Sequence, residues 1–317
     1  MRKVRFSRIT RSAEFGIGLA FAAELVLFSF LSPYFLTADN LLNVSLQVSI
    51  IAIIAAGMTF VILTAGIDLS VGSLVAIAGI VATSLLRLDI PLPFAFVVAT
   101  VGGIAVGALS GAIAGLCVTR FNITPFIVTL ALMTIWRGTA FVYTEGQPVW
   151  QLPPAFALLA SGRILNVPIP AVVMVVVFVV SHVVLTRTRF GRYVYAVGGN
   201  REAARLAGIR TSRILVEVYV LCGVLSAISG ILLASRMNSG QPNAGVSYEL
   251  DVIAAVVVGG TSLFGGRGSI IGTFIGAMLI AVLRNGLNLL NVGSYVQQII
   301  VGVVILAAVL IDQMRKK

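Results

Sequence analysis

Residues 168–213 read PIPAVVMVVVFVVSHVVLTRTRFGRYVYAVGGNREAARLAGIRTSR, and a change of character within this stretch decides the fold class. The part from Pro168 to Thr186 contains no Asp, Glu, Lys or Arg. It has about the 20 residues that a helix needs to cross a bilayer. The part from Arg187 to Arg213 carries seven arginines. An apolar run that ends in a basic loop is typical of a transmembrane helix whose end faces the cytoplasm.

Similar apolar runs recur along the whole chain. Hydrophobic residues make up 59% of its 317 positions and charged residues only 10%, against about 25% charged residues in soluble domains. The pattern predicts an all-α polytopic membrane protein with about ten transmembrane helices, at 15–32, 42–64, 68–87, 93–118, 123–142, 168–186, 213–234, 249–263, 268–290 and 293–312. The segment 249–263 would cover only about 22 Å, so we expect a broken or steeply embedded helix there.

The basic residues predict the orientation of these spans. With both termini in the cytoplasm, seventeen of the 22 Lys and Arg residues lie on the cytoplasmic side, as the positive-inside rule requires. We therefore expect a basic cytoplasmic N-terminus at 1–14, one transmembrane domain at 15–312 with a cytoplasmic loop at 187–213, and a basic tail at 313–317. The net charge of +11 then reflects membrane topology, and no nucleic-acid partner is expected.

The cytoplasmic loop contains the signals of a short helix outside the bilayer. Asn200, after Gly199, is a good N-cap, and Gly208 is a good stop signal after a run of helix-favouring residues. The alternative is a solvated loop whose charges only follow the positive-inside rule.

A second stretch with turn signals joins two predicted spans. It reads Thr64-Ala65-Gly66-Ile67-Asp68-Leu69-Ser70-Val71-Gly72-Ser73. Asp68 or Ser70 could cap the following helix, and a capped tight turn is a sufficient structural explanation. The spacing from Ala55 to Ser70 equals that from Ala254 to Ser269, and both stretches contain a glycine break. This similarity indicates an internal repeat, which is common in transporters, or a chance match in Gly- and Ala-rich sequence.

The short predicted helix resembles a motif of bacterial ATP-binding-cassette (ABC) importer permeases. Glu202-Ala203-Ala204 followed by Gly208 is similar to their EAA loop. The resemblance implies that this helix docks into a groove on a separate ATPase. We assign the coupling site to Gly199, Asn200, Glu202, Ala203, Ala204, Arg205, Gly208 and Ile209.

The turn at 64–73 resembles the signature of the ribose-type permease family, with Gly66, Asp68, Ser70 and Gly72 as its characteristic residues. Further similar segments lie at 188–193, 198–200, 248–251, 258–263 and 285–288. The resemblance implies an inner-membrane permease that moves a ribose-like pentose, a hexose or a polyol. It also implies three kinds of partner: a periplasmic sugar-binding protein, an ATPase, and a second copy of the permease or a paralogous permease.

No enzymatic or metal chemistry is expected of this chain itself. The glycine-rich stretch 260–269 lacks the lysine of a phosphate-binding loop, so ATP hydrolysis is expected on another polypeptide. The only histidine, His182, lies near the inner end of a span. We expect neither a cofactor nor a metal site.

A neutral sugar needs a path lined by amide and hydroxyl groups. The residues of this kind that we assign to the path include Asn43, Gln47, Thr64, Asn285, Asn288 and Gln297, although such groups also hold helices together. Among intramembrane charges, Glu217 is expected to pair with Arg213 and Arg137 to extend outward. A competing hypothesis is an ion-coupled secondary carrier that uses Glu24 or Asp68, and a third is a membrane scaffold that transports nothing.

Overall fold

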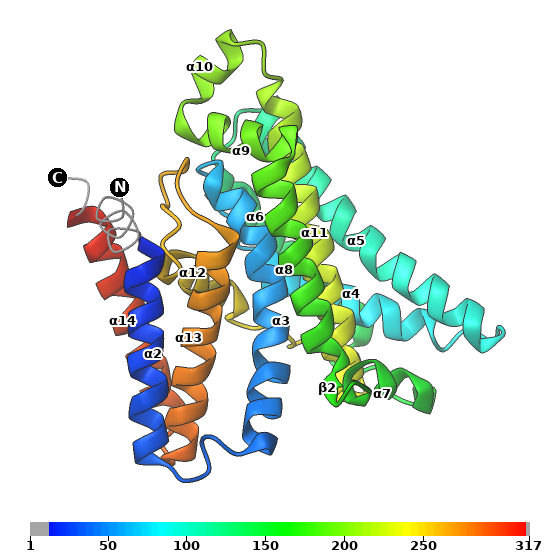
Figure 1. Cartoon of the computed structure of the whole chain (residues 1–317). Helices are drawn as coiled ribbons and strands as arrows, with labels where there is room; N and C mark the ends of the chain where they lie inside the picture. Colours follow the sequence, from blue (N-terminus) through cyan, green and yellow to red (C-terminus); the bar gives the residue numbers. More distant parts are fainter. Residues whose placement is uncertain (1–12, 315–317) are drawn as a thin grey trace.

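A computed structural model describes residues 13–314 and consists almost entirely of helices (Figure 1). The predicted N-terminal basic segment, up to residue 12, and the tail from residue 315 lie outside the described residues. Six helices in the described part are long and apolar enough to cross a membrane: α3 (Ala38–Leu63), α5 (Leu92–Arg120), α6 (Pro125–Thr144), α8 (Ile169–Arg187), α11 (Thr211–Met237) and α13 (Ile270–Leu289). The chain is therefore an all-α polytopic membrane protein, as predicted.

Four further helices correspond to the remaining predicted spans. They are α2 (Ala13–Leu31), α4 (Val71–Leu85), α12 (Tyr248–Val258) and α14 (Ser294–Met314). The span predicted at 68–87 is shorter than expected, because the turn after α3 continues through Ser70. The span predicted at 249–263 contains a helix of only 11 residues, about 16 Å long, and irregular backbone lies on both sides of it.

The core forms around α11, which packs against α3, α4 and α5. Glycines allow these helices to approach closely. A Cβ atom on Gly107 of α5 would lie 2.2 Å from the carbonyl oxygen of Gly223 in α11, and one on Gly111 would lie 2.2 Å from that of Tyr219. Small residues at such contacts let backbones meet without interlocking side chains.

The segment between α6 and α8 contains little regular structure. It includes α7 (Pro154–Ser161) and two short antiparallel strands, β1 (Arg163–Ile164) and β2 (Val167–Pro168). Val149 in this loop exchanges two backbone hydrogen bonds with Gly240, so the loop is tied to the segment that follows α11.

The predicted cytoplasmic loop contains two helices, α9 (Arg189–Gly199) and α10 (Arg201–Leu206). Figure 1 shows α10 standing clear of the bundle at one end, with α9 between it and the ends of the long helices. Sequence reasoning predicted only the second of these helices.

Candidate functional site

The short helix α10 begins and ends at the residues that the sequence indicated. The Asn200 Oδ1 atom accepts a hydrogen bond from the Ala203 N–H group at 2.9 Å, which is N-capping geometry. At the other end, Gly208 has φ +84°. The Gly208 N–H donates to the Arg205 carbonyl, and the Ile209 N–H donates to the Ala204 carbonyl. This pair of bonds is a Schellman motif, so the local sequence defines both ends of the helix.

The surface of α10 is almost entirely open to solvent. Glu202 and Arg205 form a bidentate pair with N–O distances of 2.6 and 3.1 Å, and the hydrogen bonds from Arg205 lower the pKa of the Glu202 carboxyl. Leu206 is 76% exposed. An isolated helix of six residues is unstable in water, and an exposed pair adds little. The helix is therefore held by its caps and by its neighbours, and it offers an apolar side chain to a partner.

Helix α9 connects α10 to the transmembrane bundle. Thr188 caps it, because the Thr188 Oγ1 atom accepts a hydrogen bond from the Gly191 N–H at 3.2 Å. The Phe190 ring stacks on Phe60 of α3 with centroids 6.0 Å apart. The Tyr195 hydroxyl donates to the Gly268 carbonyl at 2.7 Å. One helix thus contacts both α3 and the loop that leads into α13.

Three backbone segments meet where α9 ends. The Gly266 N–H donates to the Leu63 carbonyl at 2.9 Å. A Cβ atom on Gly198 would lie 1.7 Å from that same carbonyl oxygen, and one on Gly265 would lie 2.9 Å from the Gly198 carbonyl oxygen. We call this contact of Leu63, Gly198 and 265–266 the glycine junction. It joins the end of α9 to the end of α3 and to the loop before α13.

The signature turn lies beside the glycine junction and is buried. Asp68 is 0% exposed, and its Oδ1 atom accepts hydrogen bonds from the Ser70 N–H at 2.9 Å and the Ser70 hydroxyl at 2.6 Å. Ser70 precedes α4 but makes no side-chain capping bond. A Cβ atom on Gly66 would lie 2.6 Å from the Tyr219 hydroxyl, and one on Gly72 would lie 2.3 Å from the Gly245 carbonyl oxygen. Gly66 and Gly72 therefore pack the turn against α11 and the segment before α12, while Asp68 and Ser70 bond each other within the turn.

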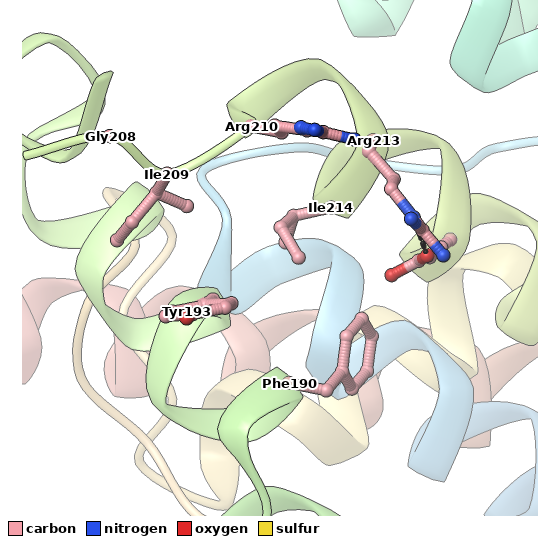
Figure 2. A pocket seen from close by; sticks show the side chains of 8 residues that line it. Phe190, Tyr193, Gly208, Ile209, Arg210, Arg213 and Ile214 are labelled. Carbon is pink, nitrogen blue, oxygen red and sulfur yellow. Dashed lines mark hydrogen bonds and ion pairs between the residues drawn. The ribbon is translucent and has the colours of Figure 1, made fainter.

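A pocket of about 370 Å³ lies where α9, the turn after α10 and the start of α11 meet. Figure 2 shows Ile209, Tyr193, Phe190 and Ile214 around it, with Arg210 and Arg213 along one edge. Arg213 donates to Glu217 at 2.7 Å, which confirms the predicted pair one helical turn apart. The apolar floor and an edge that contains Arg210 and the Arg213–Glu217 pair make a concave surface beside α10.

The predicted pathway residues fall into two groups. Asn43, Gln47 and Asn288 are exposed. Among the others, Thr64 is buried and donates to the Val61 carbonyl, and Gln297 donates to the Val292 carbonyl. Asn285 exchanges two hydrogen bonds with Asn40, at 2.9 and 3.0 Å, and so joins α13 to the start of α3.

The other intramembrane charges have different surroundings. Arg137 does not extend outward as predicted. Its Nη1 atom donates to the Pro242 and Ala244 carbonyls at 2.6 and 2.7 Å. Glu24 in α2 has one buried carboxylate oxygen without a hydrogen-bond partner among residues 13–314. In that same range, no group of three or more His, Cys, Asp or Glu residues could hold a metal ion.

The family model described as branched-chain amino acid transport system / permease component matches residues 40–309. The chain belongs to this permease family. It is a transport component, so ATP hydrolysis is not expected of it, and it crosses the membrane several times.

Several curated relatives resemble the permease over nearly its full length. It is 47% identical to the ribose import permease of Escherichia coli (strain K12), covering 94% of this chain and 93% of the relative. The ribose import permease of Bacillus subtilis (strain 168) is 48% identical, covering 100% and 96%. The L-arabinose ABC transporter permease of Azospirillum brasilense is 40% identical, covering 92% and 86%. No solved structure matches the permease.

Proposed function

We propose that this permease forms the inner-membrane pathway of an ABC importer for a monosaccharide, and that a separate ATPase drives it by binding α10. The relatives above are named for the import or transport of ribose and L-arabinose, and a further relative, 35% identical, is named for D-allose. These are pentoses and a hexose, which are neutral solutes rich in hydroxyl groups.

The single observation that carries the proposal is the position of α10. It is capped at both ends, exposed on almost all sides, and connected through α9 to the glycine junction. A rigid helix of this kind converts a displacement of its partner into a displacement of the segments at its base. The contacts of α9 with α3 and with the loop before α13 give two routes by which such a movement reaches the spans.

In this proposal the chain crosses the membrane ten times. The crossings are α2, α3, α4, α5, α6, α8, α11, α13 and α14, together with the segment 238–258 that contains α12. Both termini are then cytoplasmic, on the same side as α9 and α10. Two permease copies, or this copy and a paralogous permease, enclose the pathway, and a periplasmic binding protein delivers the sugar to the other side.

An ion-coupled carrier receives less support from the same residues. Asp68, one of its two candidate coupling groups, is fully buried. A coupling carboxyl has to exchange ions with the pathway, whereas Asp68 has no exposed surface in this structure.

Co-purification tests the docking role. The tagged permease is expressed with its ATPase, and the amount of ATPase retained on the tag is measured. Leu206→Asp places a charge on the exposed apolar side chain of α10, and we expect at least a tenfold loss of retained ATPase. Leu165→Asp is the matched control, because Leu165 is 93% exposed in the β1–β2 turn on the opposite side. Equal retention of ATPase by both variants would contradict the proposal.

A further inference from the structure

The segment between α11 and α12 runs through the bundle without helical structure. A Cβ atom on Gly240 would lie 3.0 Å from the Ile80 Cα atom, whereas one on Gly245 would lie 2.5 Å from the Gly72 carbonyl oxygen. Ile80 and Gly72 are eight residues apart in α4, which corresponds to about 12 Å along the helix. The backbone therefore extends about 12 Å along α4 between Gly240 and Gly245, and α12 begins near mid-height of the bundle (Figure 1).

Backbone of this kind is constrained by the membrane. Non-helical segments at membrane depth occur only where protein buries them or where they line a water-filled cavity, because lipid cannot hydrogen-bond their polar groups. On one side of the segment, Arg137 donates hydrogen bonds to the Pro242 and Ala244 carbonyls. That contact also fixes the position of the stretch relative to α6.

The other side of the segment is open. Asn243, Val246 and Ser247 are exposed. No hydrogen bond joins the side chain of Asn243 or Ser247 to any other group within residues 13–314, and Ser247 does not cap α12. Ser247 also has φ +65°, an unfavourable backbone conformation for a residue other than glycine. The fold thus leaves the Asn243 amide and the Ser247 hydroxyl, four residues apart in the chain, without a partner among residues 13–314. In the proposed topology both lie inside the membrane.

We propose that Asn243 and Ser247 line the solute pathway and hydrogen-bond the hydroxyl groups of a neutral sugar as it passes. This inference rests on the proposed function. An amide and a hydroxyl both donate and accept hydrogen bonds, so they match the hydroxyls of a sugar without a fixed charge that would delay release. In other transporters discontinuous membrane helices likewise form substrate sites, because the interrupted helix presents polar groups near the middle of the bilayer.

Thiol labelling tests whether this face meets water. Asn243→Cys and Ser247→Cys permeases are assembled with their ATPase in vesicles and treated from either side with a charged, membrane-impermeant methanethiosulfonate. The unmodified chain gives the background, because Cys222 is buried and Cys117 partly buried. Val176→Cys is the matched control, since Val176 is 55% exposed on the apolar helix α8. We expect both pathway cysteines to react at least tenfold faster than the control cysteine.

Transport tests whether the two side chains contact the solute. D-Ribose uptake is measured for Asn243→Ala and Ser247→Ala at equal amounts of assembled complex. Loss of one hydrogen bond to the sugar is expected to lower kcat/KM about fivefold in each variant, while Val176→Ala keeps the uptake of the unmodified permease. Unchanged uptake in both variants would overturn the assignment of solute contact.

The two assays separate the inference from the proposed function. Labelling as slow as that of Val176→Cys, in a complex that imports D-ribose, overturns the inference and leaves the function intact, because the segment is then covered by lipid or by a second copy. Fast labelling in a complex that imports no sugar supports the aqueous pathway. It contradicts both the proposed import of a monosaccharide and the contact of Asn243 and Ser247 with a sugar.

Discussion

A methyl group at Gly198 is expected to uncouple transport from ATP hydrolysis. In Gly198→Ala the new Cβ atom would lie 1.7 Å from the Leu63 carbonyl oxygen. Real Cβ atoms keep at least 3.0 Å from such an atom. The ends of α9 and α3 therefore have to separate by roughly 1.3 Å, because an overpacked contact is relieved by a backbone shift. The Leu63 carbonyl also accepts the Gly266 N–H. A shift of this size strains or breaks that bond.

The expected cost follows from these two effects. Overpacking of a tight contact costs about 1–3 kcal/mol, and a lost backbone hydrogen bond about 1 kcal/mol. A displacement of α10 then moves α3 and the loop before α13 by a smaller distance than in the unmodified permease. We expect sugar uptake per ATP hydrolysed to fall at least fivefold, while the ATPase still co-purifies because α10 itself is unchanged.

The neighbouring glycine provides the matched control for this variant. A Cβ atom on Gly199 would meet nothing within 4 Å, so Gly199→Ala changes the same segment without a clash. Uptake and ATP hydrolysis are measured together in proteoliposomes that contain the permease, its ATPase and its binding protein. Equal coupling ratios for Gly198→Ala and Gly199→Ala would refute the role of the glycine junction. If Gly199→Ala instead weakened binding of the ATPase, less ATPase would co-purify with the permease.

Three further variants test the local geometry. Asn200→Ala removes the capping bond to Ala203 and is expected to destabilise α10 by about 1 kcal/mol and to weaken ATPase retention, whereas Asn200→Asp restores it; equal retention by the two variants contradicts the capping role. Asp68→Asn keeps an oxygen that accepts both bonds from Ser70, so uptake is expected to persist, and loss of uptake with an intact fold would favour a coupling carboxyl. Asn285→Ala leaves Asn40 without its partner in α13 and is expected to lower the free energy of unfolding of the detergent-solubilised protein by about 1–3 kcal/mol. An unchanged unfolding transition would contradict a stabilising role of the Asn40–Asn285 pair.

Local signals in the sequence predicted helix α10 well. The Asn200 cap and the Gly208 stop involve residues within one helical turn of the bonds they make, so the sequence alone contains the necessary information. The apolar runs likewise predicted most spans, because bilayer thickness sets their length.

Contacts between distant segments could not be predicted in the same way. The glycine junction depends on Leu63, Gly198 and Gly266 meeting in space, and nothing in the sequence around Gly198 indicates that contact. Helix α9 was missed because its apolar side chains, such as Phe190 and Tyr195, are interspersed with arginines that indicated only membrane topology. Arg137 was expected to extend outward from its span. Its true partners, the Pro242 and Ala244 carbonyls, are more than a hundred residues away in the sequence, so no local pattern indicates them.

The segment before α12 shows the same limit. Hydropathy indicated a weak span at 249–263, whereas the irregular part of the segment comes earlier, around Pro242 and Gly245. A polar stretch without periodicity is typical of a surface loop. Only its contacts with α4 place it inside the bundle.

The most direct test of the account is uptake of a labelled monosaccharide, with D-ribose first, by vesicles that contain the permease with or without its ATPase. The binding protein is supplied on the outer side and ATP on the inner side, and proton and sodium gradients are imposed separately. We predict uptake only when the permease, the ATPase, ATP and the binding protein are all present. Gradient-driven uptake by the permease alone would contradict the account.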